Sequence, residues 1–324
     1  MREELLDEIR EHVVSQLIAR TPWISEEEVT SKGVALAEWS SGYGPFTQLL
    51  SGEPFTDLFI NGNAGAWIGR GAGLEPITLD LSERVLINYI RSQALRVGKH
   101  FDQAHPAVNL ELGKGIRLHA LLPPIIEGGV HISLRVNQQR AVLTDDAQLD
   151  SLLDAIINKR QNFLISGGTG SGKTTLLSHL IEKIPRSERI LVIEDTHEIQ
   201  GNHPHLLRLQ SREPNSEGLG EIPIRELIRQ ALRMKPDRIF LGEVRGADVL
   251  DLFLALNTGH AGSGATIHAN SPQDIPNRIA ALAMTIGIPR EGALALYSSA
   301  IDLNIHLDSA LGGNRIAAIN EVGS

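Results

Sequence analysis

Residues 167–174 read GGTGSGKT, which fits the pattern G-x-x-x-x-G-K-[ST] of a phosphate-binding loop. The apolar stretch Phe163 to Ser166 before it predicts a strand, and the stretch Thr175 to Ile184 after it predicts a helix. In such a loop, glycines let backbone N–H groups converge on phosphates at a helix N-terminus. Because motif and flanks agree, the stretch predicts a P-loop nucleotide site rather than a chance glycine-rich turn.

Two side chains of this loop have distinct predicted roles. Lys173 brings positive charge to the β- and γ-phosphates of ATP, and the Thr174 hydroxyl is a predicted ligand of Mg²⁺. The other residues predicted to contact the nucleotide are Gly168, Thr169, Gly170, Ser171, Gly172 and Thr175.

Length and composition predict an ordinary globular protein of two domains. The chain has 324 residues, 42% of them hydrophobic and none of them cysteine, so disulfides and thiolate metal sites are excluded. No apolar run is long enough to span a membrane and no signal peptide is evident, so we expect a cytoplasmic protein. The net charge of −9 argues against a chain whose main task is to coat nucleic acid.

The hydrophobic pattern divides the chain into four predicted parts. Residues 1–40 carry an amphipathic helix with Leu5, Ile9, Val13 and Leu17 on one face. Residues 41–136 read as an α+β domain with antiparallel strands, and 137–146 as a polar linker. Residues 147–324 alternate apolar runs with helical stretches, which predicts an α/β domain with a parallel sheet.

Acidic residues follow two predicted strands of the second domain. The strand Ile190 to Ile193 leads into Glu194 and Asp195, with Glu198 one turn later, and the strand Ile239 to Leu241 leads to Glu243. Because carboxyl ends of parallel strands share one edge of a sheet, these carboxylates are expected beside the nucleotide. There they could hold Mg²⁺ or orient the attacking water; a solvated acidic strand end is the alternative.

Histidines are ambiguous when taken alone. His260 and His268 lie in the loop-rich segment 258–270, where neutral imidazoles commonly satisfy loops. His203 and His205 form a pair without a third ligand at metal spacing, so a zinc site is not expected.

Four blocks in a fixed order resemble the secretion-system ATPase superfamily, which powers type II and type IV secretion machines and type IV pili. They are the phosphate loop, an Asp box at 193–198, an atypical Walker B segment at 239–246 and a His box at 258–270. The segments 231–238 and 266–272 look like the CpaF/TadA branch in particular, and the resemblance covers residues from about 40 to 324.

The resemblance implies a fold, an assembly and residue roles. It implies a RecA-like P-loop domain preceded by a smaller α+β domain, arranged as a homo-hexameric ring that works with inner-membrane platform proteins. Family roles match these residues: Glu198 as the water-orienting carboxylate, Glu243 at the Walker B position, Asp195 in the metal shell, His260 and His268 near the γ-phosphate, and Arg117 and Arg135 reaching the nucleotide. Glu194 is the next catalytic candidate if Glu198 is not the base. A surface salt bridge is the alternative for the two arginines.

Three functions remain open at this point. The first is a motor ATPase peripheral to the inner membrane, serving a Tad-type pilus, a conjugation apparatus or another secretion machine. The second is a RecA-like nucleic-acid translocase, against which the acidic charge argues, so no direct contact with nucleic acid is expected. The third is a nucleotide-gated assembly scaffold, which the complete set Lys173, Glu198 and Glu243 disfavours.

Overall fold

The chain folds into two compact units, residues 1–138 and 139–324. The computed structural model describes residues 42–70, 73–113, 115–136, 147–199, 201–308 and 315–322. The predicted N-terminal helix and the predicted linker 137–146 lie outside these described residues.

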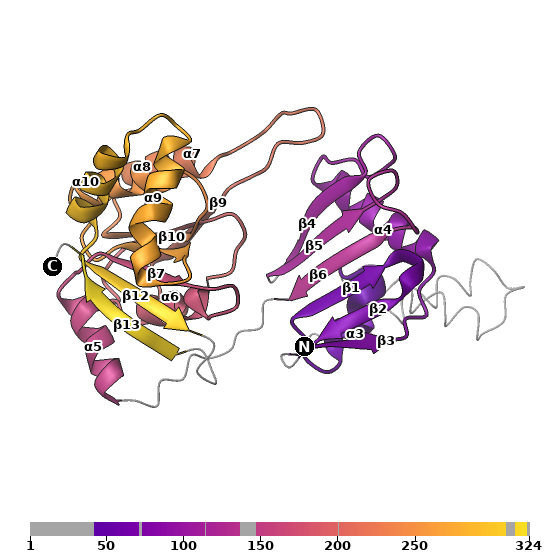
Figure 1. Cartoon of the computed structure of the whole chain (residues 1–324), viewed down its shortest axis with the longest axis horizontal. Coiled ribbons are helices and arrows are strands. Elements are labelled where there is room, and N and C mark those ends of the chain that lie inside the picture. Colours follow the sequence, from indigo (N-terminus) through magenta and orange to yellow (C-terminus); the bar gives the residue numbers. More distant parts are fainter. Residues whose placement is uncertain are drawn as a thin grey trace, which may run out of the picture. The chain divides into compact units, whose positions relative to one another are not determined.

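The first unit is an antiparallel sheet covered on one face by a helix (Figure 1). The strand order is β3-β2-β1-β6-β5-β4, and every neighbouring pair is antiparallel. Buried residues alternate with partly or fully exposed ones along β1 and β5, as expected for strands with one covered face. The elements are η1 Gly44–Phe46, α3 Thr47–Ser51, β1 Asp57–Asn61, η2 Gly62–Ala64, β2 Ala66–Gly69, β3 Leu74–Ile77, α4 Glu83–Arg96, β4 Ala107–Gly113, β5 Ile116–Leu121 and β6 His131–Val136.

Helix α4 has a recognisable sequence signal at each end. The Ser82 hydroxyl accepts a hydrogen bond from the Val85 N–H at 3.4 Å, as an N-cap residue should. After the last helical residue, Arg96, the chain reaches Gly98 with a φ of 72°, the left-handed conformation favoured just past a helix end. The buried Tyr89 of this helix contacts Phe46 edge to face, which ties α4 to the start of the unit.

The second unit is built on a seven-stranded sheet in the order β13-β12-β7-β11-β10-β8-β9. All neighbouring strands from β12 to β9 are parallel, and only the edge pair β12 and β13 is antiparallel. The elements are α5 Ala147–Asn158, β7 Phe163–Gly167, α6 Lys173–Glu182, β8 Ile190–Glu194, β9 Leu206–Gln210, α7 Ile224–Arg233, β10 Arg238–Val244, α8 Asp248–Leu256, β11 Gly264–His268, η3 Pro272–Asp274, α9 Ile275–Met284, α10 Arg290–Ala300, β12 Leu303–Asp308 and β13 Arg315–Glu321.

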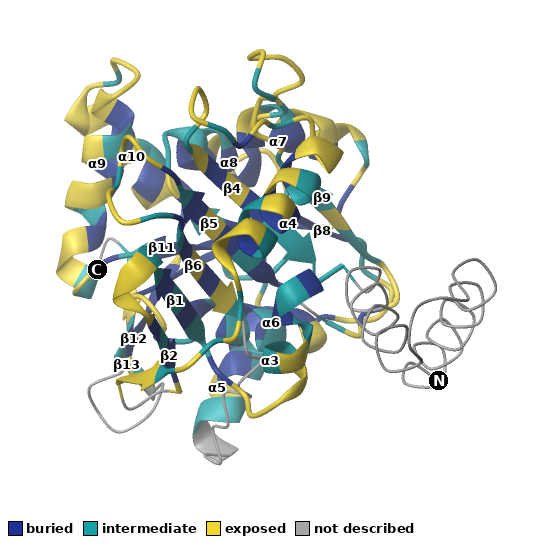
Figure 2. Ribbon diagram, turned by 90° about the vertical axis from the view of Figure 1, so that its right-hand side faces the viewer, coloured by how far each residue is buried: buried dark blue, intermediate teal, exposed yellow. Residues whose placement is uncertain are grey.

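Helices cover both faces of this sheet. Phe163 and Ile165 of β7 pack with α5 and α6, whereas Leu164 between them faces the opposite core with α7, α8, α9 and α10. The strands β7 and β8 are therefore buried along their whole length, and β10 is buried at every position except Glu243 (Figure 2). This explains why β7 and β8 read as unbroken apolar runs rather than alternating ones.

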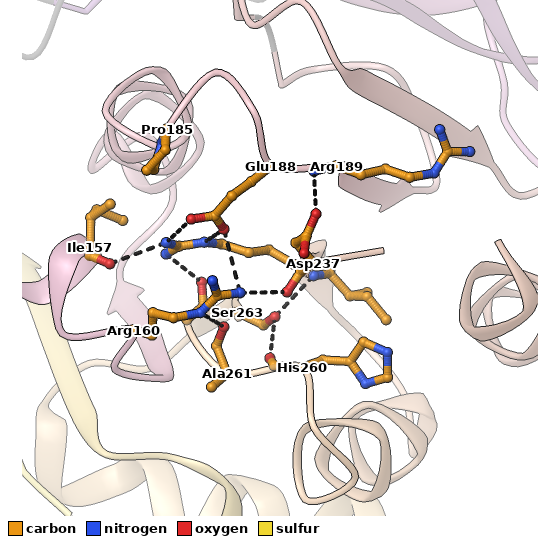
Figure 3. A network of polar contacts seen from close by, with 12 residues as sticks. Ile157, Arg160, Pro185, Glu188, Arg189, Asp237, His260, Ala261 and Ser263 are labelled. Atoms are coloured by element: carbon orange, nitrogen blue, oxygen red, sulfur yellow. Dashed lines mark hydrogen bonds and ion pairs between the residues drawn. The ribbon is translucent and has the colours of Figure 1, made fainter. Parts of the chain in front are cut away.

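A polar network joins the strands at the edge where they begin (Figure 3). Arg238, 1% exposed, donates to both carboxylate oxygens of Glu188 at 2.7 and 3.1 Å and to the carbonyls of Ile157 and Gly262 at 3.2 Å each. Arg160 adds an ion pair to the same carboxylate at 3.4 Å. These contacts brace α5, β8, β10 and the loop before β11 at the edge opposite the phosphate loop.

Candidate functional site

The phosphate loop runs from the end of β7 into the start of α6. Gly172 has a φ of 88° and stands at the N-cap position of α6, a conformation in which a side chain would be strained. Lys173 follows it and is only 7% exposed. Its Nζ donates to the carbonyls of Gly167 at 3.0 Å and Gly168 at 2.7 Å. The ammonium group is therefore held inside the loop, next to the start of a helix, where anions bind readily.

The Asp-box segment brings Glu198 to this loop. The Thr174 hydroxyl lies 3.4 Å from Glu198 Oε2, across 24 residues of sequence. This contact places a carboxylate beside the hydroxyl that the sequence predicts to bind Mg²⁺. The two groups come from α6 and from the loop after β8, so the shared edge of the parallel strands unites them.

Glu194, the last residue of β8, is oriented differently. It is 3% exposed, and its Oε1 accepts hydrogen bonds from the N–H groups of Glu198 at 3.0 Å and Ile199 at 2.8 Å. Burial raises the pKa of Glu194 to about 7, although the two backbone donors oppose that shift. The Glu194 carboxylate therefore holds the backbone of the loop that follows β8 at residues 198 and 199.

His268 connects the phosphate loop to the Walker B strand. Its Nε2 lies 2.8 Å from Glu243 Oε1, and its Nδ1 lies 3.5 Å from Lys173 Nζ. Burial and the nearby charge of Lys173 lower the pKa of His268, which favours a neutral ring. A neutral ring with its proton on Nε2 fits both neighbours, because it donates to the carboxylate and accepts from the ammonium.

Arg245 is a site residue that the sequence interpretation did not single out. Its Nε donates to Glu243 Oε2 at 2.7 Å, and its Nη1 lies 3.5 Å from Asp195 Oδ2. Burial alone would lower the pKa of Arg245, but the charges of Glu243, Asp195 and Glu198 outweigh it and raise that pKa. Its place two residues after a strand-end glutamate was the signal that could have found it.

Asp195 is engaged by two protein partners. Besides Arg245, the Ser211 hydroxyl donates to Asp195 Oδ1 at 2.8 Å. Within the described residues no group of three or more His, Cys, Asp or Glu side chains is arranged to hold a metal ion. The Thr174 hydroxyl and nearby carboxylates nevertheless suit Mg²⁺, which keeps most of its waters and takes few protein ligands beside substrate phosphates.

A pocket of about 500 Å³ adjoins the phosphate loop on the side of β11. It is lined by Gly168 and Thr169 of the loop, by His268, and by Asn277 and Arg278 of α9. The Arg278 charge contributes to lowering the pKa of His268. A second positive side chain therefore faces the space beside the loop.

The structure does not bring His260 to this group. Residues 264 and 268 of β11 pair with 163 and 167 of β7, so His268 lies at the phosphate-loop end of β11 and His260 lies before its other end. His260 Nδ1 contacts the carbonyl of Ala255 at 3.0 Å, and its own carbonyl accepts from the Ser263 hydroxyl beside the Arg238 network (Figure 3).

Arg117 and Arg135 belong to the first unit. They stand opposite each other on the neighbouring strands β5 and β6, and Glu111 on β4 is opposite Arg117 on its other side. The sequence prediction that they reach the nucleotide therefore concerns another unit and stays a prediction. Among the described residues, no helix is long and apolar enough to cross a membrane.

Comparison with known proteins places this geometry in a family. Residues 105–308 match the family model described as Type II/IV secretion system protein. A Mycobacterium tuberculosis protein named for conjugal transfer is 37% identical over 307 residues, covering 90% of this chain and 87% of its own. Protein VirB11 of Rhizobium radiobacter is 41% identical over 267 residues, covering 70% and 76%.

A solved structure confirms the predicted fold. The pilus retraction motor PilT with bound ADP superposes with a TM-score of 0.58 at 21% identity, covering 83% of this chain and 80% of its own. At that identity the likeness concerns the fold alone: a RecA-like P-loop domain preceded by a smaller α+β domain. Together with the family model and its relatives, these observations show that the chain belongs to the type II/IV secretion system protein family.

Proposed function

We propose that this chain hydrolyses Mg·ATP at its phosphate loop and so drives a type IV secretion or Tad-type pilus assembly machine from the cytoplasmic side of the inner membrane. The observation that carries the proposal is the convergence of Lys173, Thr174, Glu198, His268 and Glu243 at one edge of the second sheet. Relatives named for conjugal transfer and VirB11 support the class of machine.

Each residue has a distinct task in this mechanism. Lys173 and the start of α6 bind the phosphates, and Glu198, beside Thr174, orients and polarises the attacking water. The Thr174 hydroxyl, with support from Asp195, would hold Mg²⁺, which would supply positive charge to neutralise the phosphate oxygens. Neutral His268 contacts both Lys173 and Glu243. When Lys173 loses its contact with a phosphate, a movement of Lys173 can therefore be passed through His268 to Glu243 on β10.

The assembly we propose is a homo-hexameric ring. Within the described part of the second unit, Arg245 lies at the phosphate-loop edge of the sheet but already pairs with Glu243. Its charge is therefore directed to that carboxylate rather than to the phosphates. Further positive charge on the phosphates is proposed to come from Arg117 and Arg135 of the first unit and from a neighbouring subunit. Inner-membrane platform proteins are the proposed partners that receive the motion.

A phosphate-release assay on the purified full chain tests the proposal. We expect turnover of Mg·ATP that does not change when single- or double-stranded DNA is added, and loss of turnover in Lys173→Ala. Lys159→Ala, an exposed lysine outside the site, is the matched control and should behave as wild type. Strong stimulation by DNA would support a translocase instead, and tight ATP binding without hydrolysis would support an assembly scaffold.

A further inference from the structure

The buried carboxylate of Glu194 makes its hydrogen bonds to the loop that follows β8. Its Oε1 is occupied by two backbone donors, the N–H groups of Glu198 and Ile199. Its Oε2 has no hydrogen-bond partner among the described residues, and its nearest ionic neighbour is His197 Nδ1 at 3.7 Å. A carboxylate that accepts two N–H groups from a chain four and five residues later fixes the shape of that loop.

Gly242 of the neighbouring strand leaves the space that this carboxylate fills. Leu241 of β10 pairs with Ile193 of β8, so the next residues, Gly242 and Glu194, lie side by side. A Cβ at position 242 would stand 2.8 Å from Glu194 Cγ and 3.3 Å from its Oε1. The φ of Gly242 is not in the left-handed region, so the glycine is needed for room rather than for backbone conformation.

The loop held by Glu194 carries Glu198. One of the two donated N–H groups is that of Glu198 itself, and the carboxylate of Glu198 lies 3.4 Å from the Thr174 hydroxyl. Ile199, which gives the second N–H, is fully buried in the core cluster that also contains residues of α6. The path from Gly242 through Glu194 to Glu198 therefore links the Walker B strand to the mouth of the phosphate loop by direct contacts.

We propose that Glu194 is a positioning residue, which holds the Glu198 carboxylate at Thr174 through the loop backbone and which Gly242 accommodates by lacking a side chain. This inference rests on the proposed function for its kinetic consequence only. The geometric claim, that Glu194 fixes the loop, holds whether or not ATP is hydrolysed.

Two substitutions separate positioning from chemistry. Glu194→Ala removes both acceptor bonds, so kcat should fall about 100-fold while nucleotide affinity is kept, because the phosphate loop is untouched. Glu194→Gln retains an oxygen that accepts both N–H groups, although more weakly, and should recover about tenfold of that loss. If Glu194→Gln is as inactive as Glu194→Ala, the negative charge itself takes part in the chemistry and the proposal is overturned.

A double-mutant cycle tests the role of Gly242. Gly242→Ala should lower kcat in the wild-type background, because the new Cβ displaces the Glu194 carboxylate. In the Glu194→Ala background the Cγ and carboxylate of residue 194 are gone, so the Cβ at position 242 fits. Gly242→Ala should then lower kcat little further. Equal effects of Gly242→Ala in both backgrounds would contradict the steric link and overturn that part of the proposal.

Hydrogen exchange distinguishes failure of this inference from failure of the proposed function. The amides of Glu198 and Ile199 should exchange roughly tenfold faster in Glu194→Ala than in wild type, while amides of β7 stay unchanged. Unchanged exchange at both amides overturns the inference. Faster exchange in a chain whose wild type shows no ATP turnover supports the positioning role and contradicts the ATPase proposal.

Discussion

One ammonium group, that of Lys173, links the halves of the site. It contacts two loop carbonyls and His268, and through His268 it is connected to Glu243. The sequence predicted the lysine and both glutamates from motif positions. It could not predict which side chains pair, because Lys173, His268 and Glu243 come from α6, β11 and β10 and meet only in the folded domain.

Lys173→Ala should weaken nucleotide binding without unfolding the protein. The change removes a phosphate contact but no apolar core packing, and it releases two carbonyls, that of Gly167 at the end of β7 and that of Gly168 in the loop. Without ligand, we expect the free energy of unfolding to change by no more than about 1 kcal/mol, so the thermal midpoint should shift only slightly. Fluorescent-nucleotide titration and thermal melting check this. Loss of folding, or affinity equal to that of Lys159→Ala, would contradict the placement of the site.

At the scale of the elements, the burial of a strand explains in part whether it could be predicted from the sequence. Buried parallel strands such as β7 and β8 produce continuous apolar runs, and these were predicted within a residue or two of their bounds. The strands that were not predicted are β3, β4, β9, β11, β12 and β13. In β4 the buried Val108 and Leu110 alternate with exposed residues, a weaker signal than a continuous apolar run.

Strand bounds also explain the difference between the two His-box histidines. Only five residues, Gly264–His268, form β11, so His260 and His268 are separated by its whole length. Their shared motif suggested a shared location. Whether each histidine lies beside the phosphate loop depends on which end of β11 it stands at. The sequence pattern alone does not give the bounds of β11.

The Arg238 network is expected to stabilise the second unit strongly. Among the described residues, Arg238→Ala would leave the Glu188 carboxylate, whose side chain is 13% exposed, with Arg160 as its one ionic partner, and would leave two carbonyls without this donor. Breaking one partner of a buried ion pair costs about 3 to 5 kcal/mol. For a unit of this size the thermal midpoint should fall by roughly 10 °C.

A matched control is available on the surface. Arg225 pairs with Asp251 at 3.1 Å, but its side chain is 53% exposed. Arg225→Ala should therefore lower stability by no more than about 1 kcal/mol. If Arg238→Ala has the same thermal midpoint as Arg225→Ala, the polar network at the edge where the strands begin contributes far less to stability than its burial indicates.

At the scale of the whole molecule, the proposed ring makes a prediction about mass. The family resemblance implies six chains, and a closed ring of identical subunits lets each complete its neighbour's site. Light scattering with and without ATP should report about six chains in at least one nucleotide state. A strict monomer at micromolar concentration in every state would contradict the ring.

The most direct test of ATP hydrolysis at this site is to compare Glu198→Gln with wild type and Glu243→Gln on one preparation. Both changes keep shape and remove one negative charge, so each variant should still bind Mg·ATP. As the water-orienting carboxylate, Glu198 should account for about 10²- to 10⁴-fold in turnover, or about 3 to 5 kcal/mol in the barrier. Glu243→Gln weakens the pairs with Arg245 and His268, so its Mg²⁺ dependence or assembly should change as well.

The decisive measurement is the ATP turnover of Glu198→Gln at saturating Mg·ATP, with nucleotide affinity determined in parallel. The account predicts wild-type affinity with turnover lowered at least 100-fold. Turnover at the wild-type rate would contradict it, because the carboxylate that lies 3.4 Å from Thr174 would then have no part in hydrolysis.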